Sequence, residues 1–146
     1  MRTSIFAIAI AVLLLSGWGG TEAADAPSAT VAPNPLEFPA QSFTPQSATS
    51  AAGTITVSNP AAGAPIKFSN INPTQPDFAV TGGTCKIAAP LAPGASCTIL
   101  VTFKPLQVGH RQATLFVEWD GNQVKVKVHL SGVANAPKPA SSPTPG

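Results

Sequence analysis

The sequence predicts an all-β fold in which two antiparallel sheets pack face to face as a sandwich. Apolar and polar residues alternate in several short runs, which is the period of a half-buried strand. The 16 prolines and 12 glycines disfavour helices and are typical of turns. The pair Asp120-Gly121 stands between two alternating runs and predicts a hairpin, because both central residues of such a turn need positive φ.

The first 24 residues are predicted to be a secretory signal peptide. Arg2 supplies a positive start, residues 5–15 are uninterruptedly apolar, and small residues up to Ala24 offer a cleavage point. A retained membrane anchor is the alternative, but the apolar run is shorter than the ~20 residues of a spanning helix. We therefore expect an exported protein of the periplasm, cell surface or medium, with no stable membrane span after cleavage.

The rest of the chain is predicted to hold one domain. Residues 25–33 are expected to be a flexible leader, residues 34–134 the domain, and residues 135–146 a disordered Pro/Ser-rich tail. A domain of this length matches one sandwich. The net charge is +2 and the charges are scattered, whereas a nucleic-acid-binding domain usually concentrates basic residues on one face. No nucleic-acid partner is therefore expected.

Each predicted strand has its own alternating core face. Ile55 and Val57 share one face, Ile66 and Phe68 share the next, and the later strands follow the same pattern. The predicted strands cover residues 36–38, 54–58, 65–69, 78–80, 98–103, 113–119 and 124–130. Six or seven short strands at this spacing predict an antiparallel sandwich with Greek-key links, and a β-barrel is the structural alternative.

The two cysteines, Cys85 and Cys97, have two interpretations. An even number of cysteines in an exported chain favours a disulfide. A metal site is the rival, but His110 and His129 are the only available histidines and neither lies at metal-ligand spacing. We expect neither a metal nor a cofactor.

Several separate segments together carry a family resemblance. They are NPLEF at 34–38, TITVSN at 54–59, DF at 77–78, LAPGASCTI at 91–99, VTFKP at 101–105, GHRQATL at 109–115 and LSG at 130–132. In this order they resemble the ASH-type domain, the immunoglobulin-like module named after abnormal-spindle and hydin proteins. Exported bacterial members often carry the label choice-of-anchor D. The resemblance implies a seven-stranded sandwich with Cys85 bridged to Cys97, and it implies no common active site.

The sequence contains no catalytic motif, so we predict that the protein is not an enzyme. G-x-S-x-G, H-E-x-x-H and phosphate-binding loops are all absent. Ser96 stands in a Gly-Ala-Ser-Cys turn and is better explained by hairpin formation. A serine triad using His110 or His129 is the alternative, because triads assemble in space rather than in sequence.

Five residues form the predicted interaction surface. Leu100 and Phe116 are out of phase with the core faces of their strands, so both should point outward. Lys125, Lys127 and His129 would line the outward face of the last strand. The alternatives are a loop that covers the two apolar residues and an ordinary solvated face for the three cationic ones.

These observations predict an exported, non-catalytic module for protein–protein interaction, adhesion or envelope scaffolding. The expected partner is another envelope or surface protein. One alternative is a carbohydrate- or envelope-binding accessory module that uses Trp119 or the lysines; its partner would be a glycan. A further alternative is a pilus-chaperone-like protein that lends a strand to a client, although such chaperones typically have two domains.

Overall fold

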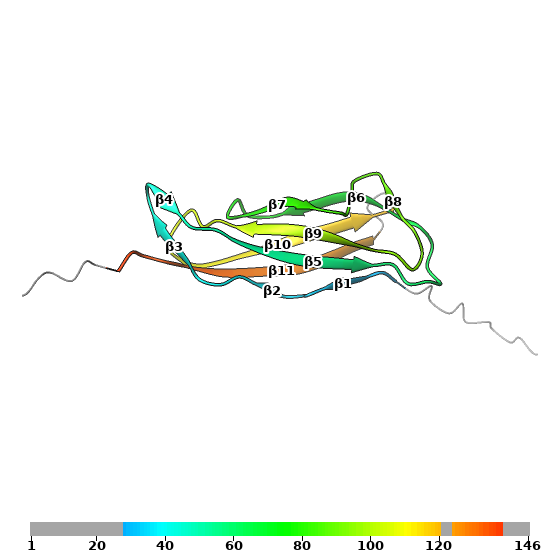
Figure 1. Ribbon diagram of the computed structural model, residues 1–146, viewed down its shortest axis with the longest axis horizontal. Coiled ribbons are helices and arrows are strands. Elements are labelled where there is room, and N and C mark those ends of the chain that lie inside the picture. The colour runs from blue at the N-terminus through cyan, green and yellow to red at the C-terminus, as the bar shows by residue number, and fades with distance from the viewer. Residues whose placement is uncertain (1–27, 121–123, 139–146) are drawn as a thin grey trace, which may run out of the picture.

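The computed structural model describes residues 28–120 and 124–138, which form two β-sheets packed face to face (Figure 1). The predicted signal peptide, residues 1–24, lies outside the described residues. So do residues 121–123, at the tip of the hairpin predicted from Asp120-Gly121. No helix long and apolar enough to cross a membrane is found among residues 28–120 and 124–138. The all-β, immunoglobulin-like sandwich predicted from the sequence is confirmed.

The first sheet contains four antiparallel strands in the order β1-β5-β9-β7. Its two central strands are the longest, and β7 pairs with β9 through a β-bulge between Val80 and Gly82. The strands are β1 (Thr30–Ala32), β5 (Ala51–Ser58), β7 (Phe78–Gly83) and β9 (Ser96–Phe103).

The second sheet follows the order β4-β3-β11-β10-β6-β8, with β2 also paired to β11. The strands β2 and β3 run parallel to β11, and the other pairs are antiparallel. The strands are β2 (Leu36–Glu37), β3 (Gln41–Thr44), β4 (Ser47–Ala48), β6 (Ile66–Pro73), β8 (Pro90–Leu91), β10 (Gly109–Trp119) and β11 (Val124–Asn135).

The chain crosses between the two sheets near its described start. β1 pairs with β5 in the first sheet, whereas β2 pairs with β11 in the second. Residues 33–35 (PNP) connect the two short strands, and proline is compatible with this position because it cannot donate to a ladder. With β1 to β3 counted as one divided strand, the six longer strands complete the seven-stranded immunoglobulin arrangement.

The domain begins earlier than the sequence predicted. Residues 30–32 were expected in a flexible leader, but they form β1, and Val31 pairs with Val57 and packs against the core. A three-residue strand is too short to show alternation, which explains why the sequence pattern did not reveal it.

Alternating residues from both sheets form the core, as the sequence predicted. Phe38, Phe78 and Phe103 form an aromatic cluster, with ring centroids 4.9–5.7 Å apart. Gly132 of β11 lies against this cluster: a Cβ atom there would come within 2.5 Å of the Phe103 ring. The fully buried aliphatic side chains include Ile55, Val57, Ile99, Val101, Leu115, Val117, Val128 and Leu130.

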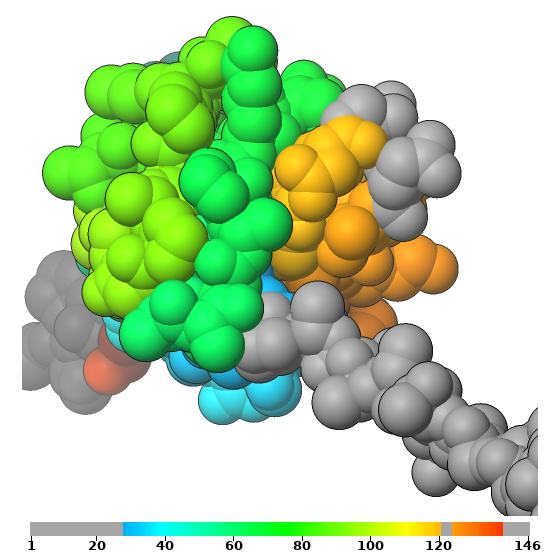
Figure 2. Space-filling model, turned by 90° about the vertical axis from the view of Figure 1, so that its right-hand side faces the viewer, coloured from blue at the N-terminus to red at the C-terminus, as the bar shows by residue number. Residues whose placement is uncertain are grey.

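One end of the sandwich is closed by loops that Asn59 holds together. Figure 2 views this end, where the β5–β6 and β7–β9 connections (green to yellow-green) meet the strands of the second sheet (orange). The buried Asn59 side chain donates hydrogen bonds to the carbonyls of Ala64 and Leu91, at 2.8 and 3.0 Å. Its backbone also bonds Gly94 and Ala95, so one residue fixes both connections.

Candidate functional site

The five residues of the predicted interaction surface do not form one patch. Phe116 of β10 and Lys125, Lys127 and His129 of β11 share the outer face of the second sheet. Leu100 of β9 lies half-buried on the outer face of the first sheet. The prediction that groups Leu100 with Phe116 is therefore wrong, because consecutive strands β9 and β10 belong to different sheets.

Phe116 lies at the centre of the outer face of the second sheet. Its backbone is in register with Asn72 of β6 on one side and Lys127 of β11 on the other. The Lys125 ammonium lies 5.1 Å from the centre of the Phe116 ring, within the range of a cation–π contact. The ring is half-buried, so part of it is accessible to a partner.

The two lysines beside Phe116 differ in their surroundings. The Lys125 ammonium forms a 2.7 Å ion pair with the buried carboxylate of Glu118, which also accepts a hydrogen bond from Asn70. The hydrogen bond from Lys125, aided by Asn70, holds the pKa of Glu118 below its ordinary value against the opposing effect of burial. No described carboxylate forms an ion pair with Lys127, so its charge is available to a ligand.

A polar depression of about 480 Å³ continues this face beyond Phe116. Thr114, the second residue before Phe116 in β10, is in register with His129 there. The polar side chains that line the depression belong to Glu37, Thr74, Gln112, Thr114, His129 and Ser131. We call the depression together with Phe116, Lys125, Lys127 and His129 the lysine face.

A buried ion pair that no sequence pattern indicated joins the start of β7 to β10. The side chain of Asp77 is 1% exposed, and Arg111 Nη2 lies 2.9 Å from its Oδ2. Arg111 Nε and the Leu106 N–H both donate to Oδ1. Burial alone would raise the pKa of Asp77, but these hydrogen bonds outweigh it and lower the pKa below its ordinary value. The pair anchors the β9–β10 connection and is structural.

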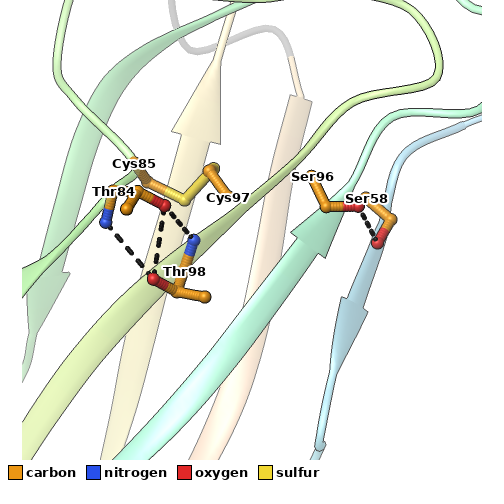
Figure 3. Close-up of a disulfide and its surroundings, with 6 residues drawn as sticks. All are labelled: Ser58, Thr84, Cys85, Ser96, Cys97 and Thr98. Carbon is orange, nitrogen blue, oxygen red and sulfur yellow. Dashed lines mark hydrogen bonds between the residues drawn. A yellow bond between two sulfur atoms is a disulfide. The ribbon is translucent and has the colours of Figure 1, made fainter.

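The predicted disulfide between Cys85 and Cys97 is confirmed. It links the segment after β7 to β9, and Figure 3 shows it beside Thr84 and Thr98, whose side chains bond to each other. In the part of the chain that the structure describes, no group of three or more His, Cys, Asp or Glu residues could hold a metal ion.

Ser96, the serine considered in the sequence, does not lie beside either histidine. The Ser96 hydroxyl, on the first sheet, donates to Ser58 Oγ at 2.9 Å. His110 and His129 lie on β10 and β11 of the second sheet. Ser96 lies on the outer face of the first sheet and both histidines lie on the outer face of the second, so the two sheets separate them.

The alternative sugar-stacking role of Trp119 is not supported either. Trp119 is 3% exposed and packs edge-on against Phe68, with 6.3 Å between ring centroids. A stacking platform must offer an open ring face, and this ring offers none.

The family of the chain follows from a comparison with family models. Residues 45–133 match the model of the HYDIN/CFA65/VesB-like, Ig-like domain. The chain belongs to this family. The comparison agrees with the ASH-type resemblance seen in the sequence, and it indicates an immunoglobulin-like interaction domain. A search of curated proteins gave no significant match.

Solved structures with a similar fold include domains from bacterial and human proteins. The ASH/PapD-like domain 7 of human CEP192 matches with a TM-score of 0.59 and 13% identity, over 94% of this chain and 100% of that one. The Vibrio cholerae VesB protease matches with a TM-score of 0.53 and 14% identity, over 72% of this chain. The secreted serine protease VesC from Vibrio cholerae matches with a TM-score of 0.48 and 18% identity, over 67% of this chain. This chain spans 31% of VesB and 21% of VesC, and the likeness concerns the fold alone.

Proposed function

We propose that the chain is an exported, non-catalytic module that binds another protein of the cell envelope or surface through the lysine face. In this proposal it is an ASH-type domain of the choice-of-anchor D kind, released from a signal peptide at residues 1–24 and followed by a Pro/Ser-rich tail. The disulfide supports an oxidising compartment, because such bonds persist outside the cytosol. The family is an immunoglobulin-like domain family, which supports a binding role.

The placement of Phe116 carries the proposal. A half-buried aromatic ring lies in the middle of a broad sheet, with the Asn72 amide on one side and Lys127 on the other. No described carboxylate forms an ion pair with that lysine. Aromatic side chains dominate the binding energy of protein interfaces when polar groups surround them. The regular strands β6, β10 and β11 hold these groups in place, so a partner would bind a surface that is already formed.

A glycan is the second candidate ligand, and the polar depression supports it. Hydroxyl, amide, carboxylate and imidazole groups line the depression, and such groups can hydrogen-bond a sugar. A strand-lending role has less support, because β2 and β3 occupy the outer edge of β11 around Leu130 and Ala134. That edge is therefore not free to pair with a client.

Site-specific photo-crosslinking in the native host tests the proposal. A photoreactive residue at position 127 should give an adduct that protease digestion removes, and Phe116→Ser should abolish it. The same probe at position 56, on the outer face of the first sheet, should not trap that partner. An adduct removed by glycan-degrading enzymes but not by protease would establish glycan binding instead. Equal capture of the partner from positions 127 and 56 would refute a specific lysine face.

A further inference from the structure

All charged residues and histidines in the described strands belong to the second sheet. The strands β1, β5, β7 and β9 consist of TVA, AAGTITVS, FAVTGG and SCTILVTF and contain none. The strands of the second sheet carry Glu37, Lys67, His110, Arg111, Glu118, Lys125, Lys127 and His129. The strands of the first sheet therefore present no charge on their outer face, and the nearest basic residues in sequence, Lys86 and Lys104, lie beyond the ends of β7 and β9.

The outward side chains of the first sheet are mostly threonines around one leucine. Leu100 lies at the centre, in register with Thr54 on one side and Gly82 on the other. Gly82 has no side chain, and even a Cβ atom added there would only make ordinary contact with Leu100, at 3.8 Å. The leucine is therefore open from that side. We call Thr54, Thr56, Thr81, Thr98, Leu100 and Thr102 the threonine face.

Three of the five hydroxyl groups of the threonine face, those of Thr81, Thr98 and Thr102, have hydrogen-bond partners among neighbouring threonines. Thr81 Oγ1 lies 2.8 Å from Thr102 Oγ1, and Thr84 Oγ1 accepts from the Thr98 N–H at 2.9 Å. The Ser58–Ser96 pair continues the pattern at the end of the sheet, as Figure 3 shows. A partner covering this face would therefore leave few hydroxyls without hydrogen bonds, which lowers the cost of burying them.

The edges of the first sheet are protected against strand pairing, whereas its face is not. The bulge between Val80 and Gly82 interrupts the outer edge of β7, and a bulge hinders the addition of another strand. The opposite edge, β1, has three residues and is followed by Pro33. Association through this sheet would therefore use the face rather than an edge.

We propose that two copies of the chain associate through their threonine faces, with Leu100 near the two-fold axis. A symmetric dimer apposes each surface to itself, so a charge-free face avoids the like-charge repulsion that the lysine face would produce. Four strands of this length present roughly 400–500 Å² of face, from the usual spacing and rise of strands. Two such faces bury roughly 800–1,000 Å² in total, which is less than a stable specific interface buries and is typical of a weak, transient one. We expect a dissociation constant on the order of micromolar.

The dimer is tested by sedimentation velocity on the full chain after export, from about 1 to 200 µM. Wild type should shift from monomer to dimer mass within this range. Leu100→Lys and, because Leu100 is half-buried, the milder Thr54→Lys should each weaken dimerisation at least about tenfold, since either one apposes two ammonium groups across the axis. Gln112→Lys, which adds the same charge to the outer face of the second sheet, should leave the dissociation constant unchanged.

Three results would overturn the proposal. Wild type could stay monomeric at 200 µM, or a dimer could persist in both Leu100→Lys and Thr54→Lys. A photoreactive residue at position 56 could also trap a different protein instead of a second copy. The first two results do not bear on the lysine face, because Phe116→Ser should abolish partner capture at position 127 and leave the dimer intact. The third bears on it only if the protein trapped at position 56 is the one captured at position 127.

Discussion

Arg111 Nη2 lies 2.9 Å from Asp77 Oδ2, and Arg111 Nε lies 3.1 Å from Oδ1, so the guanidinium holds both oxygens of a carboxylate that is 1% exposed. The backbone carbonyl of Asp77 also accepts from the Lys104 N–H at 2.8 Å. One residue before β7 therefore fixes the end of β9 and the beginning of β10, which belong to different sheets.

Asp77→Asn should lower the free energy of unfolding by about 2 kcal/mol at pH 7, because it removes hydrogen bonds between charged groups. The pKa of Asp77 in the folded protein lies below 3.8, so acid protonates the unfolded chain first. The stabilisation is thus complete above about pH 4 and is lost as the pH falls through the lowered pKa. Urea titrations at pH 7, 4.5 and 3 should show the difference from wild type narrowing with acid.

The exposed carboxylate Glu37 provides the control for that titration. Glu37→Gln should change the free energy of unfolding by less than about 0.5 kcal/mol at pH 7, as surface substitutions usually do. If Asp77→Asn behaves the same way, the ion pair does not stabilise the fold.

Removal of the disulfide by Cys85→Ala together with Cys97→Ala should cost about 3 kcal/mol of unfolding free energy, because the unfolded chain regains the freedom of a loop closed over 12 residues. Thermal and urea denaturation would measure the loss. The free energy of unfolding of wild type, measured in the presence of a reductant, should approach that of the double variant. Equal stability of wild type with and without reductant would show that the bond contributes nothing.

Gly132→Ala should destabilise the fold by about 1–3 kcal/mol, since the added methyl group would meet the Phe103 ring at 2.5 Å and overpack the core. Val133→Ala, at the next and exposed position of β11, is the matched control. We expect the control to stay within about 0.5 kcal/mol of wild type. A neutral Gly132→Ala would mean that the Phe103 ring can move away from β11.

Phe116→Ser should lower the free energy of unfolding by only about 1 kcal/mol, because the half-buried ring loses a cation–π contact and partial burial. Phe103→Ala, in the aromatic cluster, should cost about 3–5 kcal/mol. Paired urea titrations compare the two variants. A loss at position 116 as large as that at position 103 would show that Phe116 serves the core, and a partner-binding role would then lose its basis.

The sequence allowed prediction of the fold class, the longer strands, the buried face of each and the cysteine pair, because all of these depend on local alternation or on composition. It did not reveal how β9 and β10 divide between sheets, since alternation along a strand carries no information about which strand lies beside it. The pattern therefore indicated that Leu100 and Phe116 point outward, but not that they point in opposite directions.

Contacts between distant segments were similarly hidden. Asp77 and Arg111 are separated by 34 positions, and neither residue stands in a motif that pairs them. The short strand β1 was missed for a different reason, because three residues are too few to establish a period. The charge-free character of the first sheet could have been noticed from the strand sequences, but only the topology shows that these four strands are neighbours.

The separation of charge between the sheets also gives the molecule a polarity perpendicular to its layers. Four basic side chains and two carboxylates lie on described strands of the second sheet, and none lies on strands of the first. Because ion pairs with Asp77 and Glu118 neutralise Arg111 and Lys125, Lys67 and Lys127 carry the remaining positive charge of these strands. An anionic surface within roughly 8 Å at physiological salt would attract this side of the molecule. The first sheet, whose strands bear no charge, would then face away from that surface. The molecule would therefore be oriented relative to the surface before any contact forms.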